Sequence, residues 1–416
     1  MKIKDVIFSE GKTGFFFDDQ KAIKKGASQD GFIYIGKPEI QGFEAIRQAG
    51  ESISVIILLE DGQIAVGDCA AVQYSGAGGR DPLFLANKYI PFLEKNIKPL
   101  LIGENLKSFK DLSRKIDNLI IDGNKIHTAL RYGLSQAILD AISKAYHETI
   151  VETIWREYNL PKIIKKVPIF GQSGDERYTN VDKMILKEAD VLPHGLINNV
   201  ETKLGKNGEL LKEYISWIVN RIKKIRIHSN YNPTIHIDVY GTIGIIFDNN
   251  IEKIADYLAS LEKYSESFQL YIEGPVDLGE KNRQIEYLSK IKERLENNGS
   301  KVKIVADEWC NTFEDIIEFT DAKACHMVQI KTPDLGSVHN IIESVIYCKN
   351  NGMEAYQGGT CNETDVSARI CTNIGVAVQS DRLLAKPGMG FDEGFAIVKN
   401  EMERIINILK YKDIRR

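Results

Sequence analysis

The chain has 416 residues, of which 43% are hydrophobic, enough apolar material for more than one domain core. Its net charge is −4, with basic and acidic residues interspersed, so no basic face for nucleic acid is visible. The six cysteines lack the spacing of a zinc site, and no apolar run approaches the roughly 18 residues of a membrane span. We therefore expect two domains, a reducing cytoplasm, and a small-molecule partner rather than a nucleic acid or a membrane.

Residues 1–160 place strands before helices, which predicts an α+β domain. Apolar alternation predicts strands, and apolar residues at helical spacing predict helices. The predicted strands are 12–17, 31–35, 52–59 and 63–72, and the predicted helices are 83–95, 108–119 and 128–158. Glu60, Asp61 and Gly62 supply turn residues between the last two strands, so we expect a hairpin there.

The segment 74–80 is rich in glycine and follows a predicted strand. Its glycine spacing is neither that of a dinucleotide-binding turn nor that of a phosphate loop. We expect a loop that closes over a pocket, with a plain connection as the alternative.

After Pro161 the pattern changes to alternating strands and helices, which continues through residues 161–416. This length is typical of a (β/α)8 barrel. The predicted fold class is therefore α/β: a C-terminal TIM-like barrel, 161–416, with an N-terminal α+β capping domain, 1–160.

Three acidic residues each close an apolar strand of the predicted barrel, and a lysine closes the next strand. They are Asp238, Glu273, Asp307 and Lys331, each separated from the next by one strand and one helical stretch. Because the carboxyl ends of parallel barrel strands converge on one face, these residues should line a single pocket.

Convergent carboxylates need a counter-ion, since two of them about 4 Å apart repel by roughly 4 kcal/mol at an effective dielectric of about 20. An all-oxygen ligand set favours a hard cation, Mg2+, for which Mn2+ is a plausible substitute. The alternative is that each acid caps its own loop or pairs with a basic side chain. That alternative would have to hold for all three acids in succession.

Other strand ends add polar groups to the same face. Gln172 follows the first barrel strand, His194 closes the second, and Thr360 and Cys361 follow the seventh. Gln329 lies two residues before Lys331, so both side chains should point to the same side. We expect burial and the absence of an acidic partner to lower the pKa of Lys331, which makes it a candidate base.

Together these positions resemble those of the 3-methylaspartate ammonia-lyase family of the enolase superfamily, over essentially the whole chain. The resemblance implies Mg2+ ligands at Asp238, Glu273 and Asp307, and a base at Lys331 that faces His194 across the substrate. It also implies amino-acid contacts, which are Gln172, Gln329, Thr360 and Cys361.

The implied reaction is reversible elimination of ammonia from (2S,3S)-3-methylaspartate to give mesaconate, through an enediolate held by the metal and His194. The resemblance implies no organic cofactor, a possible K+ activator, a homodimer, and a place in amino-acid degradation such as glutamate fermentation.

Two rival functions remain open. One is another enzyme of the superfamily, such as a dehydratase or epimerase acting on a different acid, although no Lys-x-Lys occurs on the second barrel strand. The other is a barrel that binds an amino acid without catalysis. Single residues also have plainer interpretations: His194 as a loop cap, Cys361 as a packed side chain, and Thr360 and Gln172 as partners of loop backbone. The remaining histidines are predicted to be structural or solvent-facing: 127, 147, 228, 236, 326 and 339.

Overall fold

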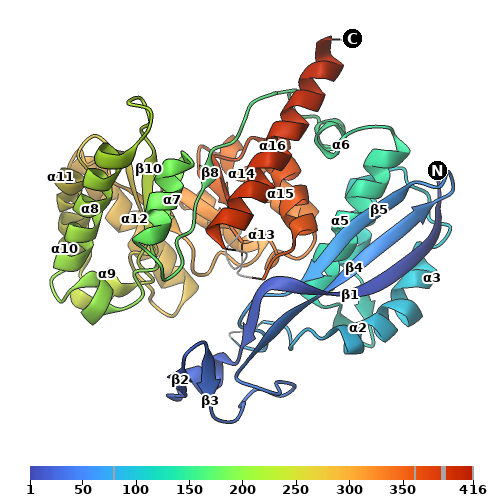
Figure 1. The fold of residues 1–416 in the computed structure, drawn as a ribbon, viewed down its shortest axis with the longest axis horizontal. Coiled ribbons are helices and arrows are strands. Elements are labelled where there is room, and N and C mark those ends of the chain that lie inside the picture. Colours follow the sequence, from blue (N-terminus) through green and yellow to red (C-terminus); the bar gives the residue numbers. More distant parts are fainter. Residues whose placement is uncertain (78–79, 360–361, 386–389, 415–416) are drawn as a thin grey trace.

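The computed structural model of the chain describes residues 1–77, 80–359, 362–385 and 390–414. It has an N-terminal part with a long antiparallel sheet and a C-terminal closed barrel (Figure 1). The predicted fold class is therefore confirmed. Thr360 and Cys361 lie outside the described residues.

The N-terminal sheet has three antiparallel strands in the order β1-β4-β5, which are β1 (Ile3–Asp18), β4 (Arg47–Leu59) and β5 (Ile64–Ala70). Alternate residues of β4 are buried because one face of the sheet packs on helix α5 (Thr128–Ala145). Glycines allow the close contact: a Cβ added to Gly67 would lie 2.5 Å from the carbonyl oxygen of Gly133 on α5.

Most N-terminal elements occur where the pattern predicts them, and β4 and β5 form the predicted hairpin. The predicted helix 128–158 is wrong as a single element, since α5 ends at Ala145 and α6 (Ile150–Glu157) follows after His147 takes a φ of 55°. A separate small hairpin, β2 (Ser28–Asp30) with β3 (Ile33–Ile35), projects from the body (Figure 1). The other elements are α1 (Gln20–Lys24), α2 (Ala86–Phe92), a π-helical turn (Leu93–Ile97), α3 (Lys98–Leu101), α4 (Phe109–Asp117), β6 (Ile120–Ile121) and β7 (Asn124–Lys125).

Eight parallel strands form the barrel, which closes where the last strand pairs with the first. In chain order they are β8 (Ile169–Phe170), β9 (Val191–His194), β10 (Thr234–Asp238), β11 (Leu270–Glu273), β12 (Lys303–Ala306), β13 (Met327–Ile330), β14 (Glu354–Gln357) and β15 (Arg382–Leu384). The helices between and after them are α7 (Thr179–Leu186), a π-helical turn (Val200–Leu204), α8 (Glu209–Ile225), α9 (Thr242–Ile246), α10 (Ile251–Ser260), α11 (Glu262–Ser265), α12 (Lys281–Asn297), α13 (Phe313–Asp321), α14 (Val338–Asn350), α15 (Asp365–Val378) and α16 (Phe391–Ile414).

A compact layer of side chains fills the inside of the barrel. Its apolar members are Phe170, Val191, Tyr271, Val305, Met327, Tyr356 and Leu384. The other face of each strand packs against the surrounding helices, so the strands are apolar on both faces. Two polar side chains, His236 and Arg382, are buried in the inner layer.

The N-terminal sheet contacts the barrel just after β14, the seventh barrel strand. Gly14 N donates to Glu363 O at 2.8 Å, and Asn362 Nδ2 donates to Phe16 O at 3.0 Å. These bonds hold β1 against the segment that follows β14, so the first part of the chain lies over the catalytic face expected of such barrels. The boundary predicted at residue 160 falls between α6 and β8, and its position stays a prediction. None of the helices in the described part of the chain has both the length and the apolar character needed to cross a bilayer.

Candidate active site

The structure brings the predicted acids to one end of the barrel. Asp238 and Glu273 are the last residues of β10 and β11 and are paired in register. Oxygen atoms of both, together with a ring nitrogen of His194, lie within 4.8 Å of one another. Asp307 directly follows β12, and its charge acts on both carboxylates. The barrel therefore gathers oxygen donors and one imidazole around a single point.

Burial and mutual repulsion make the ionised carboxylates unfavourable here. Asp238 is 2% exposed and Glu273 is fully buried. The pKa of Asp238 is raised well above its usual value, first by burial and then by the charge of Asp307. The pKa of Glu273 is raised in the same way by burial and by Asp238. A hard divalent cation would offset both effects, so this donor set fits Mg2+.

Lys331 directly follows β13 and is 8% exposed. The prediction that it lacks an acidic partner is wrong, because its Nζ lies 2.8 Å from Asp307 Oδ1. Burial lowers the pKa of Lys331, but the charges of Asp307 and Glu308 outweigh burial, and the net effect raises it. The predicted lowering of the pKa is therefore also wrong, and Lys331 is an ammonium group when only these protein charges act on it.

His194 ends β9 with an unusual backbone. It pairs in register with Ile237, whose neighbours His236 and Asp238 point into the barrel, so a regular strand would turn His194 outward. Its φ of 64° rotates the side chain, and Nε2 lies 3.5 Å from Asp238 Oδ2. Burial lowers the pKa of His194 to about 4, so the ring is neutral at pH 7. Its buried Nδ1 has no hydrogen-bond partner among the described residues, which leaves it available to a ligand.

Gln329 contacts a predicted metal ligand. Its Nε2 lies 3.2 Å from Glu273 Oε1 and 2.5 Å from the hydroxyl of Tyr356. That hydroxyl donates to the same Glu273 oxygen at 2.7 Å, so it must accept from the amide. The amide nitrogen of Gln329 is therefore engaged at the site, whereas none of the described residues donates a hydrogen bond to its carbonyl oxygen.

The other predicted substrate contacts are less defined. Gln172 is half-buried in the segment after β8. Thr360 and Cys361 lie outside the described residues. The roles of Gln172, Thr360 and Cys361 stay predictions.

His236, which the sequence predicted to be structural or solvent-facing, contacts the site directly. It is fully buried, and its Nε2 lies 2.7 Å from Glu273 Oε2. Behind it, Arg382 Nη1 lies 2.8 Å from His236 Nδ1. The sequence carries a signal for His236, because it precedes Asp238 by two residues and so shares the inward face of β10.

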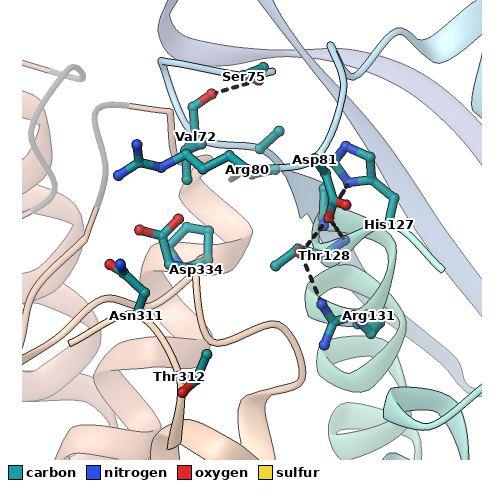
Figure 2. Close-up of a pocket in the computed structure, with 14 residues that line it drawn as sticks. Val72, Ser75, Arg80, Asp81, His127, Thr128, Arg131, Asn311, Thr312 and Asp334 are labelled. Carbon is teal, nitrogen blue, oxygen red and sulfur yellow. Dashed lines mark hydrogen bonds and ion pairs between the residues drawn. The ribbon is translucent and has the colours of Figure 1, made fainter. Parts of the chain in front are cut away.

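A cavity of about 330 Å³ lies between the two parts of the chain (Figure 2). Arg80 and Asp81 line it from the N-terminal part, and Asn311 and Asp334 line it from barrel loops. Burial raises the pKa of Asp334, and the charges of Lys331 and Arg80 oppose that rise. The N-terminal part therefore contributes side chains beside the catalytic face. Whether the segment 74–80 closes over the site stays a prediction.

Comparison with known families gives matches over nearly the whole chain. Residues 1–159 match the family described as methylaspartate ammonia-lyase N-terminus, and residues 162–411 match methylaspartate ammonia-lyase C-terminus. The chain is 59% identical to methylaspartate ammonia-lyase of Citrobacter amalonaticus, over 99% of this chain and 100% of the relative. It is 57% identical to the enzyme of Clostridium tetanomorphum, over 98% and 99%.

Solved structures agree with these matches. A crystal structure of β-methylaspartase from Clostridium tetanomorphum as an Mg complex has a TM-score of 0.98 at 56% identity, and 99% of this chain and 100% of that chain are covered. The Citrobacter amalonaticus enzyme, solved containing (2S,3S)-3-methylaspartic acid, has a TM-score of 0.97 at 59% identity, with 99% and 100% covered. The L-Ala-D/L-Glu epimerase of Bacillus subtilis shares the fold alone, with a TM-score of 0.64 at 14% identity over 95% and 91% of the two chains. The chain therefore belongs to the methylaspartate ammonia-lyase family, and it is a carbon–nitrogen lyase with an N-terminal antiparallel sheet and a C-terminal closed barrel.

Proposed function

We propose that this enzyme reversibly eliminates ammonia from (2S,3S)-3-methylaspartate to give mesaconate, and that it requires Mg2+. The observation that carries the proposal is the convergence of three carboxylates, His194 and Lys331 at one end of the barrel. The substrate assignment is supported by the 59% identical relative that was solved with (2S,3S)-3-methylaspartic acid.

In this proposal Asp238, Glu273 and Asp307 hold the cation, for which Mn2+ can substitute. Bound Mg2+ supplies a Lewis acid that stabilises negative charge developing on the substrate carboxylate next to C3. The proposed ligands suit that role because two of them are buried and mutually repulsive, so a divalent charge is the compensation they lack.

Lys331 takes the C3 proton on Nζ. It must first be neutral, and the charge of Asp307 holds its proton in place. Any positive charge that engages Asp307 weakens that hold and lowers the pKa of Lys331. The neutral Lys331 amine is therefore favoured when Asp307 holds Mg2+, with the displaced proton released to solvent.

His194 lies beside Asp238 and serves the substrate face opposite Lys331, where its Nδ1, which has no partner among the described residues, can hold a developing negative charge or a proton.

The carbonyl oxygen of Gln329 can accept a hydrogen bond from the substrate ammonium, and Gln172, Thr360 and Cys361 complete the amino-acid contacts. The electron pair left at C3 forms the C2–C3 double bond as ammonia leaves C2.

The proposal includes no organic cofactor, because acid–base groups and a cation suffice for this elimination. We also propose that K+ activates the enzyme, that it forms a homodimer, and that it acts in the cytoplasm in amino-acid degradation.

A single assay tests the central claim. The full-length protein is treated with a chelator and then assayed with (2S,3S)-3-methylaspartate, with and without added Mg2+, for ammonia and for the ultraviolet absorbance of the alkene. We expect both products only when Mg2+ is present. Full activity without a divalent cation would contradict the metal requirement. Inactivity toward methylaspartate, together with turnover of another acid, would favour a dehydratase or epimerase.

A further inference from the structure

A buried polar chain crosses the barrel interior beneath the proposed metal site. It runs from Arg382, the first residue of β15, through His236 in the middle of β10, to Glu273 at the end of β11. Arg382 is 5% exposed, and His236 and Glu273 are fully buried. A guanidinium group in the core of a barrel is costly unless its contacts repay the burial. Packing alone does not require this arrangement.

The contact with Arg382 determines which ring nitrogen of His236 carries the proton. Arg382 can only donate, so His236 Nδ1, at 2.8 Å from Nη1, must accept. The neutral ring then carries its proton on Nε2, which faces Glu273 Oε2 at 2.7 Å. The other tautomer would place two lone pairs against each other at that distance. Arg382 therefore selects the tautomer that attracts Glu273.

The ring and the carboxylate are both held in place. His236 stacks on Phe170 with ring centroids 4.5 Å apart and faces Tyr271 at 5.8 Å, so its plane is fixed. Each oxygen of Glu273 has a close neighbour: the Tyr356 hydroxyl donates to Oε1 at 2.7 Å, and His236 Nε2 lies 2.7 Å from Oε2 as an electrostatic contact without the alignment of a hydrogen bond. These two contacts restrain the carboxylate beside Asp238 and His194.

We propose that Arg382 and His236 are positioning residues that orient Glu273 for Mg2+ binding. The inference rests on the proposed function, because it takes Glu273 to be a ligand of that metal. Loss of an outer partner of a metal ligand typically weakens metal affinity by about 10- to 100-fold. We expect a loss in that range when Arg382 no longer sets the tautomer.

The test measures Mg2+ affinity of the chelated full-length protein by titration calorimetry, with melting of the metal-free protein measured alongside. Arg382→Met removes the donor and keeps much of the volume, and Arg382→Lys keeps a cationic donor. Tyr271→Phe is the matched control, because it removes the hydroxyl that donates to Glu354 at 2.8 Å in the same layer and leaves Glu273 untouched. We expect weaker Mg2+ binding by about 10- to 100-fold in Arg382→Met, partial rescue in Arg382→Lys, and wild-type affinity in Tyr271→Phe.

A double variant, Arg382→Met with His236→Phe, covers the case in which the single change does not fold, since it replaces the whole buried pair by apolar groups. It should melt near the wild type without metal and still bind Mg2+ more weakly. Wild-type Mg2+ affinity in either folded variant, or an equal loss in Tyr271→Phe, would overturn the inference while leaving the proposed function intact. Absence of Mg2+ binding by the wild type would overturn the proposed function and this inference with it.

Discussion

Lys331 Nζ lies 2.8 Å from Asp307 Oδ1, so the proposed base and a proposed metal ligand share one ion pair. The side chains are 10% and 12% exposed, which keeps water from screening their charges. Proton affinity at Lys331 and cation affinity at Asp307 are therefore coupled. Changing either residue should alter both properties.

Replacing Lys331 by alanine should abolish proton removal and spare the metal site. General acid–base groups contribute about 10²- to 10⁴-fold in rate, so turnover in Lys331→Ala should fall at least that far. Mg2+ should bind as tightly as in the wild type or more tightly, because a competing positive charge beside Asp307 is gone. Recovered methylaspartate from D2O should carry deuterium at the 3S position only with the wild type. Near-normal exchange and ammonia release in the variant would move the base to another residue.

Replacing Asp307 by asparagine should lower the pKa of Lys331, because Asp307 is the largest charge that raises it. The neutral amine reacts with acylating reagents, so Lys331 should be acetylated faster in metal-free Asp307→Asn than in metal-free wild type at pH 8 to 9. Mass spectrometry can follow the reaction against exposed Lys323 as an internal reference. Equal rates relative to Lys323 would show that the ion pair does not control the proton of Lys331.

His194 should matter for rate and for stereochemistry. Because it lies beside Asp238 and is proposed to serve the substrate face opposite Lys331, His194→Ala should depress turnover and shift the balance between 3S and 3R substrates. Steady-state rates with both diastereomers measure this. If both rates are unchanged and Mg2+ binding is normal, His194 has a structural role.

Neutralising Asp238 should have opposite effects with and without metal. Its folded pKa is raised above the unfolded value, so its ionised form destabilises the metal-free protein increasingly as pH rises above that unfolded value. Asp238→Asn should therefore melt higher than wild type at pH 7 without metal. Mg2+ at about 100 times its dissociation constant stabilises a binding protein by about 2.7 kcal/mol, and the variant should lose most of that gain.

The control for Asp238→Asn is Asp30→Asn, which makes the same charge change on an exposed hairpin strand. It should change neither the metal-free melting temperature nor the effect of Mg2+. A lower metal-free melting temperature in Asp238→Asn would contradict the prediction that burial and charge repulsion at Asp238 destabilise the metal-free protein.

His326 predicts a loss of stability in acid that does not involve the metal site. Burial lowers its pKa to about 4, against about 6.5 in the unfolded chain, and its Nδ1 accepts from Ile304 N at 3.0 Å. The stability it contributes is complete above the unfolded pKa and is lost as pH falls toward 4. Linkage gives a loss of about 2 kcal/mol between pH 7 and 5. In His326→Asn, which keeps an acceptor and cannot titrate, urea unfolding should show a correspondingly smaller loss, and parallel pH profiles would contradict this account.

The sequence by itself determined the barrel and the place of its acids. Asp238 and Glu273 end apolar strands separated by one helical stretch, and parallel strands joined in this way bring their carboxyl ends to one face whatever the details of packing. Alternation along β10 likewise places His236 on the same side as Asp238. These features depend on the spacing of residues within one strand and helix, which a sequence displays directly.

Only the tertiary structure decided which charges meet. Lys331 pairs with Asp307 because their strands, β13 and β12, are neighbours in the barrel, although the register sets Lys331 two residues beyond the position opposite Asp307. Arg382 reaches His236 because the closed barrel brings its eighth strand around to face its third. The rotation of His194 into the site depends on a backbone angle that strand alternation does not predict. The sequence shows which groups can ionise, whereas pKa values depend on burial and on distances across the barrel, which exist only after the chain has closed on itself.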